Sequence, residues 1–103
     1  MENLNKEKIF ELLYKNKDYI LNCGTKKLGL FGSYVRNEQH KKSDIDLLIE
    51  FEPNKKNYDN FINLAYYIED LFNTKVELVT TESLNPNIKK YIDKEVEYVN
   101  FFN

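Results

Sequence analysis

Two aspartates, Asp44 and Asp46, are separated by one apolar residue and precede the apolar run 47–49. We predict a strand over Ser43–Phe51, in which alternation places both carboxylates on one face, about 6 to 7 Å apart. Neighbouring anions raise each other's pKa unless a cation lies between them. Mg²⁺ suits such a pair, because it binds through few protein carboxylates together with substrate phosphates. The alternative is that the two aspartates line a solvated sheet edge.

Gly32 and Ser33 directly follow a predicted strand over Lys27–Phe31. Glycine permits a tight turn and a close approach of a phosphate to the backbone. We predict that Ser33 caps a short helix beginning near Tyr34, whose first N–H groups could bind phosphate oxygens. An ordinary strand-to-helix turn would have the same sequence, so this feature alone does not establish a phosphate site.

A third acidic residue, Glu77, lies in the alternating segment Lys75–Thr80, which we predict to be another strand. If this strand lies beside the aspartate strand, Glu77 can face the same cation. It could then bind a second metal or accept a proton from an attacking hydroxyl. Taken alone, an outward-facing glutamate on an edge strand is the simpler interpretation.

Helices must cover the strands that carry these residues. Apolar residues at helical spacing predict helices over Asn5–Leu21 and Asp59–Phe72, and Pro86 opens a last one. One side of the last helix is predicted to carry Ile88, Tyr91, Ile92, Glu95, Val96 and Val99. The order of helices and strands indicates an α/β or α+β fold with a small sheet covered by helices.

Size and composition limit the classes of function. The 103 residues predict a single domain, residues 1–103, and the net charge of −2 argues against a general nucleic-acid binder. The single cysteine, Cys23, excludes an intramolecular disulfide and is expected to be a small apolar filler near a helix end. No segment has the length of a signal peptide core or of a membrane span. We expect a soluble cytoplasmic protein that binds no nucleic acid directly and no membrane.

Ten residues separate Ser33 from Asp44, which gives the pattern G-S-x10-D-x-D followed by a distant acid. In this pattern, and in the segments GLFGSYVR, SDIDLLIEF and KVELVT, the chain resembles the minimal nucleotidyltransferases (MNT) of the DNA polymerase β superfamily. The resemblance extends from Lys27 to Val99. It implies a polymerase β-like fold with a three- to four-stranded mixed sheet flanked by helices.

The resemblance also implies roles for individual residues. Gly32 and Ser33 would bind the triphosphate of ATP, and Arg36 would contact a phosphate or form a salt bridge that braces the loop. Asp44 and Asp46 would hold two Mg²⁺ ions, with Glu77 as the third acid. Many minimal members carry aspartate at that third position, and glutamate is one methylene longer.

The family implies a protein partner, because minimal members lack the helical domain that completes the acceptor site in larger relatives. That partner is a HEPN-domain RNase toxin, and the MNT protein is its antitoxin, transferring AMP from ATP to a toxin tyrosine within a homo- or hetero-oligomer. Two alternatives remain open. The chain could neutralise a toxin by binding with weak catalysis, or it could be a stand-alone nucleotidyltransferase for small molecules.

Overall fold

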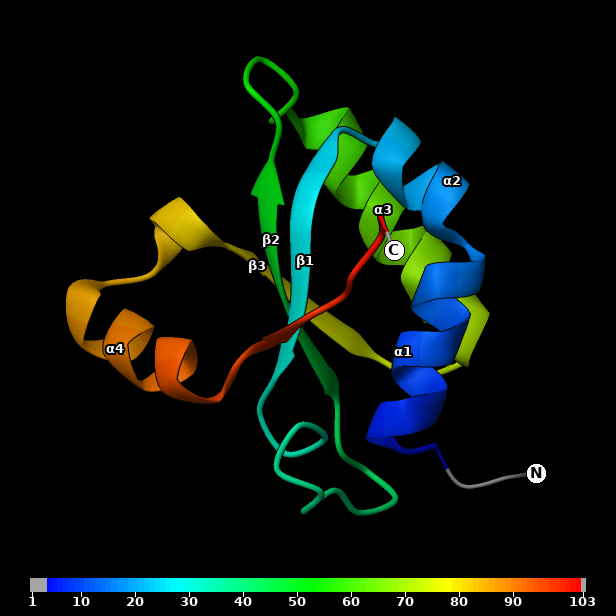
Figure 1. Ribbon diagram of the computed structural model, residues 1–103, viewed down its shortest axis with the longest axis vertical. Helices are drawn as coiled ribbons and strands as arrows, with labels where there is room; N and C mark the ends of the chain where they lie inside the picture. The colour runs from blue at the N-terminus through cyan, green and yellow to red at the C-terminus, as the bar shows by residue number, and fades with distance from the viewer. Residues whose placement is uncertain (1–3, 103) are drawn as a thin grey trace.

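The computed structural model describes residues 4–102, which form a four-stranded mixed sheet with the spatial order β3-β2-β1-β4 (Figure 1). The strands are β1 (Thr25–Phe31), β2 (Ile45–Phe51), β3 (Val76–Thr80) and β4 (Glu97–Tyr98). Strand β1 is antiparallel to both β2 and β4, whereas β2 and β3 are parallel. The predicted mixed sheet flanked by helices is confirmed.

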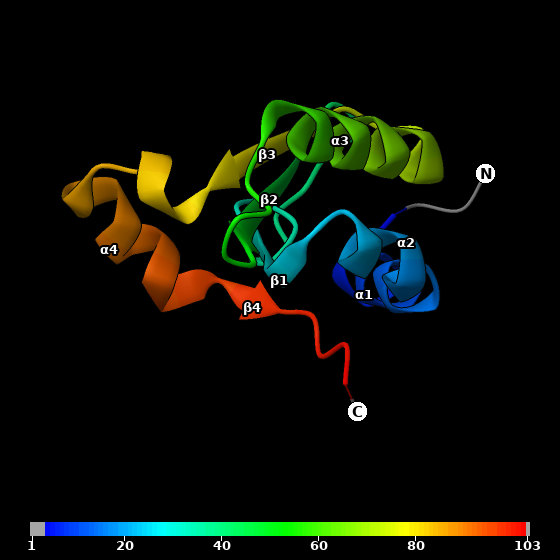
Figure 2. The same ribbon diagram turned by 90° about the horizontal axis from the view of Figure 1, so that it is seen from above.

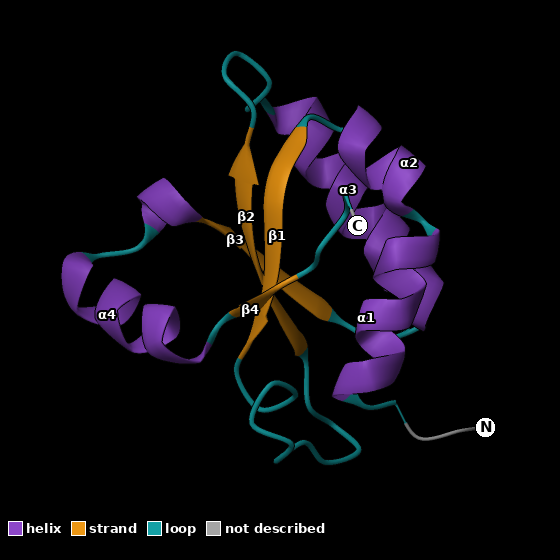
Figure 3. Ribbon diagram, viewed as in Figure 1, coloured by secondary structure: helices purple, strands orange, loops and turns teal. Residues whose placement is uncertain are grey.

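Helices lie on both faces of the sheet, but unequally. Helices α1 (Lys6–Lys15), α2 (Lys17–Asn22) and α3 (Tyr58–Phe72) lie together on one side (Figures 1 and 2). The single turn η1 (Thr81–Ser83) leads from β3 to α4 (Pro86–Glu95), which lies on the other side (Figure 3). The face of the sheet beside α4 is therefore the more open one.

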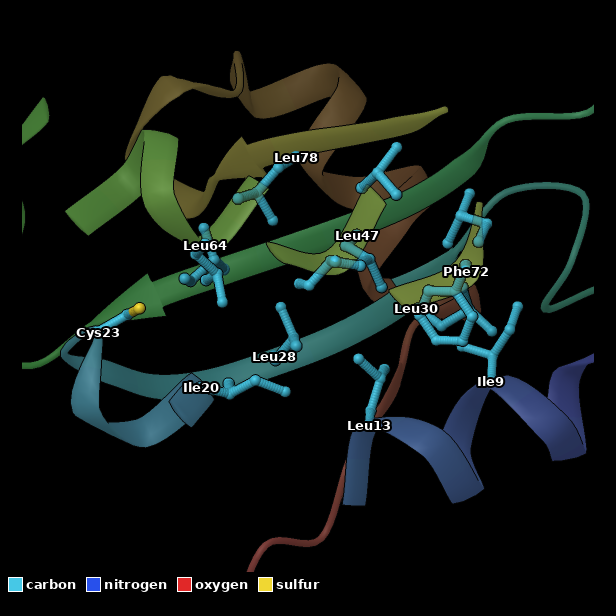
Figure 4. Close-up of a cluster of buried hydrophobic side chains, with 14 of the residues drawn as sticks. Ile9, Leu13, Ile20, Cys23, Leu28, Leu30, Leu47, Leu64, Phe72 and Leu78 are labelled. Atoms are coloured by element: carbon cyan, nitrogen blue, oxygen red, sulfur yellow. The ribbon is translucent and has the colours of Figure 1, made fainter. Parts of the chain in front are cut away.

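The main core lies between the sheet and helices α1 to α3 (Figure 4). Alternate strand residues point into it, as the period of two requires. Fully buried members from the strands are Leu28, Leu30, Ile45, Leu47 and Ile49, and those from the helices are Ile9, Leu13, Ile20, Leu64 and Ile68. Complete burial of one such side chain contributes about 1.5 to 3 kcal/mol, so this face fixes the position of the strands.

Two predicted helices differ from the observed ones. The segment Asn5–Leu21 is not one helix, because α1 ends at Lys15 and is capped by Asn16, whose side-chain amide donates to the Leu12 carbonyl at 2.8 Å. This side chain competes with the backbone for its acceptors, which favours a helix end. The short helix expected after Ser33 is absent, and residues 33–37 form a turn instead.

The C-terminal segment also differs from the prediction. Helix α4 ends at Glu95, because Val96 has an extended backbone, and the chain then forms β4, which the sequence did not predict. Of the six residues expected on one side of this helix, only Ile92 is buried, while Tyr91 is 76% exposed. Phe101 packs into the main core. Among residues 4–102, no helix is long and apolar enough to cross a membrane.

Candidate active site

The parallel pairing of β2 and β3 places Asp46 directly opposite Glu77. Both side chains lie on the sheet face away from the main core, because their neighbours Ile45 and Leu78 point into that core. Asp44 lies two residues earlier, just before β2 begins. The three acids, which we call the acidic cluster, thus lie on the more open face of the sheet. The expected juxtaposition of the third acid with the aspartate strand is present.

Burial and the neighbouring acids raise the pKa of Asp46, the central member of the acidic cluster. The pKa of Asp46 is raised from 3.8 to about 6, first because the carboxyl is partly buried and then because the charges of Glu77 and Asp44 repel its own. A hydrogen bond with Glu77 adds to the increase, whereas Arg36 opposes it. A bound cation or proton stabilises such a carboxylate, so the arrangement favours a metal ion or a proton at Asp46.

The turn after β1 lies directly against this carboxylate. Phe31 pairs with Asp46 across the β1–β2 ladder, and Gly32 follows with φ +80°. A Cβ atom built on Gly32 would collide with the carboxylate of Asp46. Glycine is therefore required twice, once by the left-handed backbone and once by the close approach of the turn to the acid.

Replacing Gly32 by alanine is expected to lower both stability and activity. The positive φ alone costs about 1 kcal/mol, and displacement of Asp46 would reduce kcat/KM at least about tenfold beyond any loss of folded protein. Gly24→Ala is a matched control, because Gly24 has φ +86° and meets the Lys55 side chain, remote from the acidic cluster. Thermal unfolding and transfer kinetics should show comparable destabilisation in both variants and a specific kinetic loss only at Gly32. Equal specific activities would contradict the prediction.

Ser33 offers two free donors in this turn, its backbone N–H and its hydroxyl. Its carbonyl accepts the N–H of Glu38 at 2.8 Å, and Asn37 closes the turn with φ +61°. Within the described part of the chain, neither the N–H nor the hydroxyl of Ser33 has a protein acceptor. Both can donate to an anionic oxygen, which is the chemistry expected of a phosphate-binding turn.

The Gly32 N–H and the Arg36 guanidinium are already engaged. Gly32 N–H donates to Oε2 of Glu95 at 2.6 Å, and Nη1 of Arg36 lies 2.8 Å from Oε1 of the same carboxylate. Arg36 also pairs with Glu38 at 3.0 Å. Of the two roles considered for Arg36, the salt bridge is the one present in this structure. Glu95 was not predicted as a site residue, because it fell within the regular spacing of the last helix.

The acidic cluster suits a cation that shares its ligands with a substrate. Between residues 4 and 102, no group of three His, Cys, Asp or Glu side chains could hold a metal ion by itself. Mg²⁺ commonly binds through one or two carboxylates and takes its remaining oxygens from water and phosphates. The raised pKa of Asp46 and the free donors of Ser33 beside it fit that kind of site.

The other residues weighed from the sequence lie outside this cluster. His40 is exposed in the loop before β2, where its backbone N–H donates to Ser43 Oγ at 2.9 Å. This is the surface position expected of it. Cys23 caps the end of α2 and is 7% exposed, as expected of a small apolar filler.

Comparison with known proteins agrees with this geometry. A family model described as a nucleotidyltransferase domain matches residues 8–99. The protein adenylyltransferase MntA of Thermococcus cleftensis is 38% identical over 100 residues, which covers 96% of this chain and 100% of that protein.

Solved structures show the same fold. A chain in a crystal structure of a toxin–antitoxin complex with AMP-PNP has a TM-score of 0.69 at 26% identity, covering 94% of this chain and 73% of that chain. A chain in a mutant MntA–HpeT toxin–antitoxin structure has a TM-score of 0.66 at 24% identity, with 94% and 73% covered, and shows the shared fold. The resemblance inferred from the G-S-x10-D-x-D pattern is confirmed. Because the family model spans most of the chain, this protein belongs to the nucleotidyltransferase domain family and is a nucleotidyltransferase.

Proposed function

We propose that this protein transfers AMP from ATP to a hydroxyl of a cognate toxin protein and thereby acts as its antitoxin. The observation that carries the proposal is the placement of the Gly32–Ser33 turn against Asp46, with Glu77 opposite Asp46 on the next strand. Two comparisons support a protein acceptor. A relative covering nearly the whole chain is named a protein adenylyltransferase, and a similar fold occurs in a toxin–antitoxin complex with an ATP analogue.

In this proposal each residue has a separate task. The N–H and hydroxyl of Ser33 bind phosphate oxygens, and the absent Cβ of Gly32 lets them approach Asp46. Asp44 and Asp46 hold Mg²⁺, with Glu77 as the third acid. When bound, Mg²⁺ neutralises the phosphate charge and orients the acceptor hydroxyl.

The chemical step is an in-line displacement at the α-phosphorus. The acceptor oxygen forms the new P–O bond while the bond to pyrophosphate breaks. The acceptor loses its proton in this step, and Glu77 is the acid placed to take it, because it is exposed at the open face beside Asp46. Positioning and electrostatic stabilisation supply most of the catalysis in such a transfer.

We further propose that the acceptor is a tyrosine of a HEPN-type RNase toxin. The support is the family resemblance together with the toxin–antitoxin complex in which a similar fold occurs. The toxin would supply the acceptor hydroxyl, in a hetero-oligomer with this chain.

The test is to incubate the purified chain with Mg-ATP and the toxin encoded beside it, and then to locate AMP on the toxin by mass spectrometry. We expect an adduct on a tyrosine, and none with an Asp44→Asn, Asp46→Asn double variant. An active toxin that remains unmodified would refute the proposal. If the double variant still neutralised the toxin fully in cells, binding alone would be the mechanism. Transfer to a small hydroxyl compound without any partner would instead support the small-molecule alternative.

A further inference from the structure

Glu95 lies at the C-terminal end of α4, far from the G-S-x10-D-x-D pattern in sequence, yet both of its carboxylate oxygens bind the turn after β1. Oε2 accepts the Gly32 N–H at 2.6 Å, and Oε1 pairs with Nη1 of Arg36 at 2.8 Å. The Glu95 side chain is 25% exposed, so these contacts are partly shielded from water. One carboxylate therefore bridges Gly32, where the chain leaves β1, and Arg36, near the end of the turn.

This bridge acts at the residue with the greatest backbone freedom. Gly32 has φ +80° and no Cβ, so holding it in one conformation costs more entropy than at any other residue type. In its other hydrogen bond, the Gly32 carbonyl accepts the Arg36 N–H at 3.3 Å, a long distance for such a bond. A charge-assisted bond at 2.6 Å is much the stronger of the two. The orientation of the next residue, Ser33, depends on that anchor.

We infer that Glu95 is a positioning residue, whose carboxylate holds Gly32 and Arg36 so that the turn stays against Asp46 and the Ser33 donors are set for a nucleotide triphosphate. The inference rests on the proposed nucleotide transfer for the identity of that ligand. Because Gly32 N–H and Arg36 are occupied by Glu95, they do not bind the phosphates; the free donors of the turn, among them the N–H and hydroxyl of Ser33, do so, and Arg36 braces the turn. Helix α4, opposite the main core, thereby determines the affinity of the site.

A simpler role would be to attach α4 to the sheet. This helix has one buried residue, Ile92, so any polar anchor could matter for its docking. Glu97 provides the matched control, because it lies two residues further on, opposite Leu30 of β1, and its carboxylate binds Lys6 of α1 at 3.0 Å instead of the turn. If attachment were the whole role, Glu95→Ala and Glu97→Ala would have similar effects on the nucleotide site.

The experiment compares wild type, Glu95→Ala, Glu95→Gln and Glu97→Ala with two readouts. Without nucleotide or metal, hydrogen exchange of the Gly32 amide is followed by NMR. We expect exchange to accelerate at least about tenfold in Glu95→Ala, as for loss of a charged hydrogen bond, with amides of β2 unaffected. Glu95→Gln retains an acceptor for Gly32 but loses the charge, and should fall between wild type and alanine. Glu97→Ala should match wild type.

In the transfer reaction, we expect Glu95→Ala to raise KM for ATP about tenfold while kcat changes less than about threefold, the pattern of lost ground-state binding. Unchanged Gly32 exchange in Glu95→Ala would overturn the inference, and so would an equal rise in KM in Glu97→Ala. If wild type transferred no AMP to the toxin, the proposed function would fail. Calorimetric titration of Mg-ATP into the same variants would then decide the inference, with equal dissociation constants overturning it.

Discussion

Asp46→Asn should abolish nucleotidyl transfer and, in the absence of metal, stabilise the protein at neutral pH. Asp46 is the central member of the acidic cluster, and the Gly32 turn lies directly on its carboxylate. An amide cannot replace a charged oxygen ligand. Loss of several kcal/mol of transition-state stabilisation corresponds to a fall in kcat of about 10³-fold or more.

The stabilisation follows from the direction of the pKa shift. The pKa of Asp46 is about 6 in the folded protein and 3.8 ordinarily, so between these values the folded state binds more protons than the unfolded state. Stability therefore falls as pH rises through this window, and the full penalty is present above it. The shift corresponds to at most about 3 kcal/mol, which partial solvent exposure reduces to about 1 to 2 kcal/mol. Asp46→Asn removes this penalty.

Urea unfolding in the presence of a chelator measures the effect. The free energy of unfolding of Asp46→Asn should exceed that of wild type by about 1 to 2 kcal/mol at about pH 8, and the difference should largely vanish at about pH 4. Asp70→Asn serves as the control, because Asp70 is an exposed aspartate of α3, outside the acidic cluster. It should retain full activity and show no comparable gain. A loss of stability in Asp46→Asn at about pH 8 would show that the negative charge of Asp46 does not destabilise the folded protein.

The sequence predicted the elements that follow from local periodicity. Alternation around Ile45 located β2, which begins two residues later than predicted, and placed Asp46 on the face away from the main core, and the helical spacing of apolar residues located α3 within one residue. The position of Glu77 opposite Asp46 required strand order and register, which tertiary packing determines. From the sequence, the role of Glu77 could therefore be predicted only on the condition that its strand lies beside the aspartate strand.

Several of the wrong or missed predictions share a physical cause, which is that polar bonds outweighed local propensity. Ser33 resembled a helix cap. However, the Glu38 N–H donates to the Ser33 carbonyl and Asn37 adopts a left-handed conformation, so the chain forms a turn. Glu95 followed the spacing of an apolar helix face, and only the fold brings it to Gly32, more than sixty residues away in sequence. A charged residue within an apolar stripe was the one signal that could have identified it.

Glu77→Gln should lower kcat by about 10²-fold, within the range of 10² to 10⁴ that a positioned proton acceptor contributes. The exchange keeps the size of the side chain and a carbonyl oxygen that can still contact Asp46, but an amide cannot accept the proton of the acceptor hydroxyl at neutral pH. Single-turnover measurement with saturating Mg-ATP and toxin isolates the chemical step. Glu82→Gln is a suitable control, because Glu82 lies in η1, just beyond β3, and pairs with Lys56 at 3.5 Å.

The Glu77→Asp variant then distinguishes the effect of the carboxylate charge from the effect of side-chain length. Aspartate keeps the charge and the basic carboxylate but shortens the side chain by one methylene, to the residue that many minimal members carry. If proton acceptance is what the position supplies, Glu77→Asp should retain transfer within about tenfold of wild type while Glu77→Gln loses it. Equal, large losses in both variants would mean that the length of Glu77 is matched to this sheet. Full activity in Glu77→Gln would remove Glu77 from the catalytic machinery and leave Asp44 and Asp46 as its only acids.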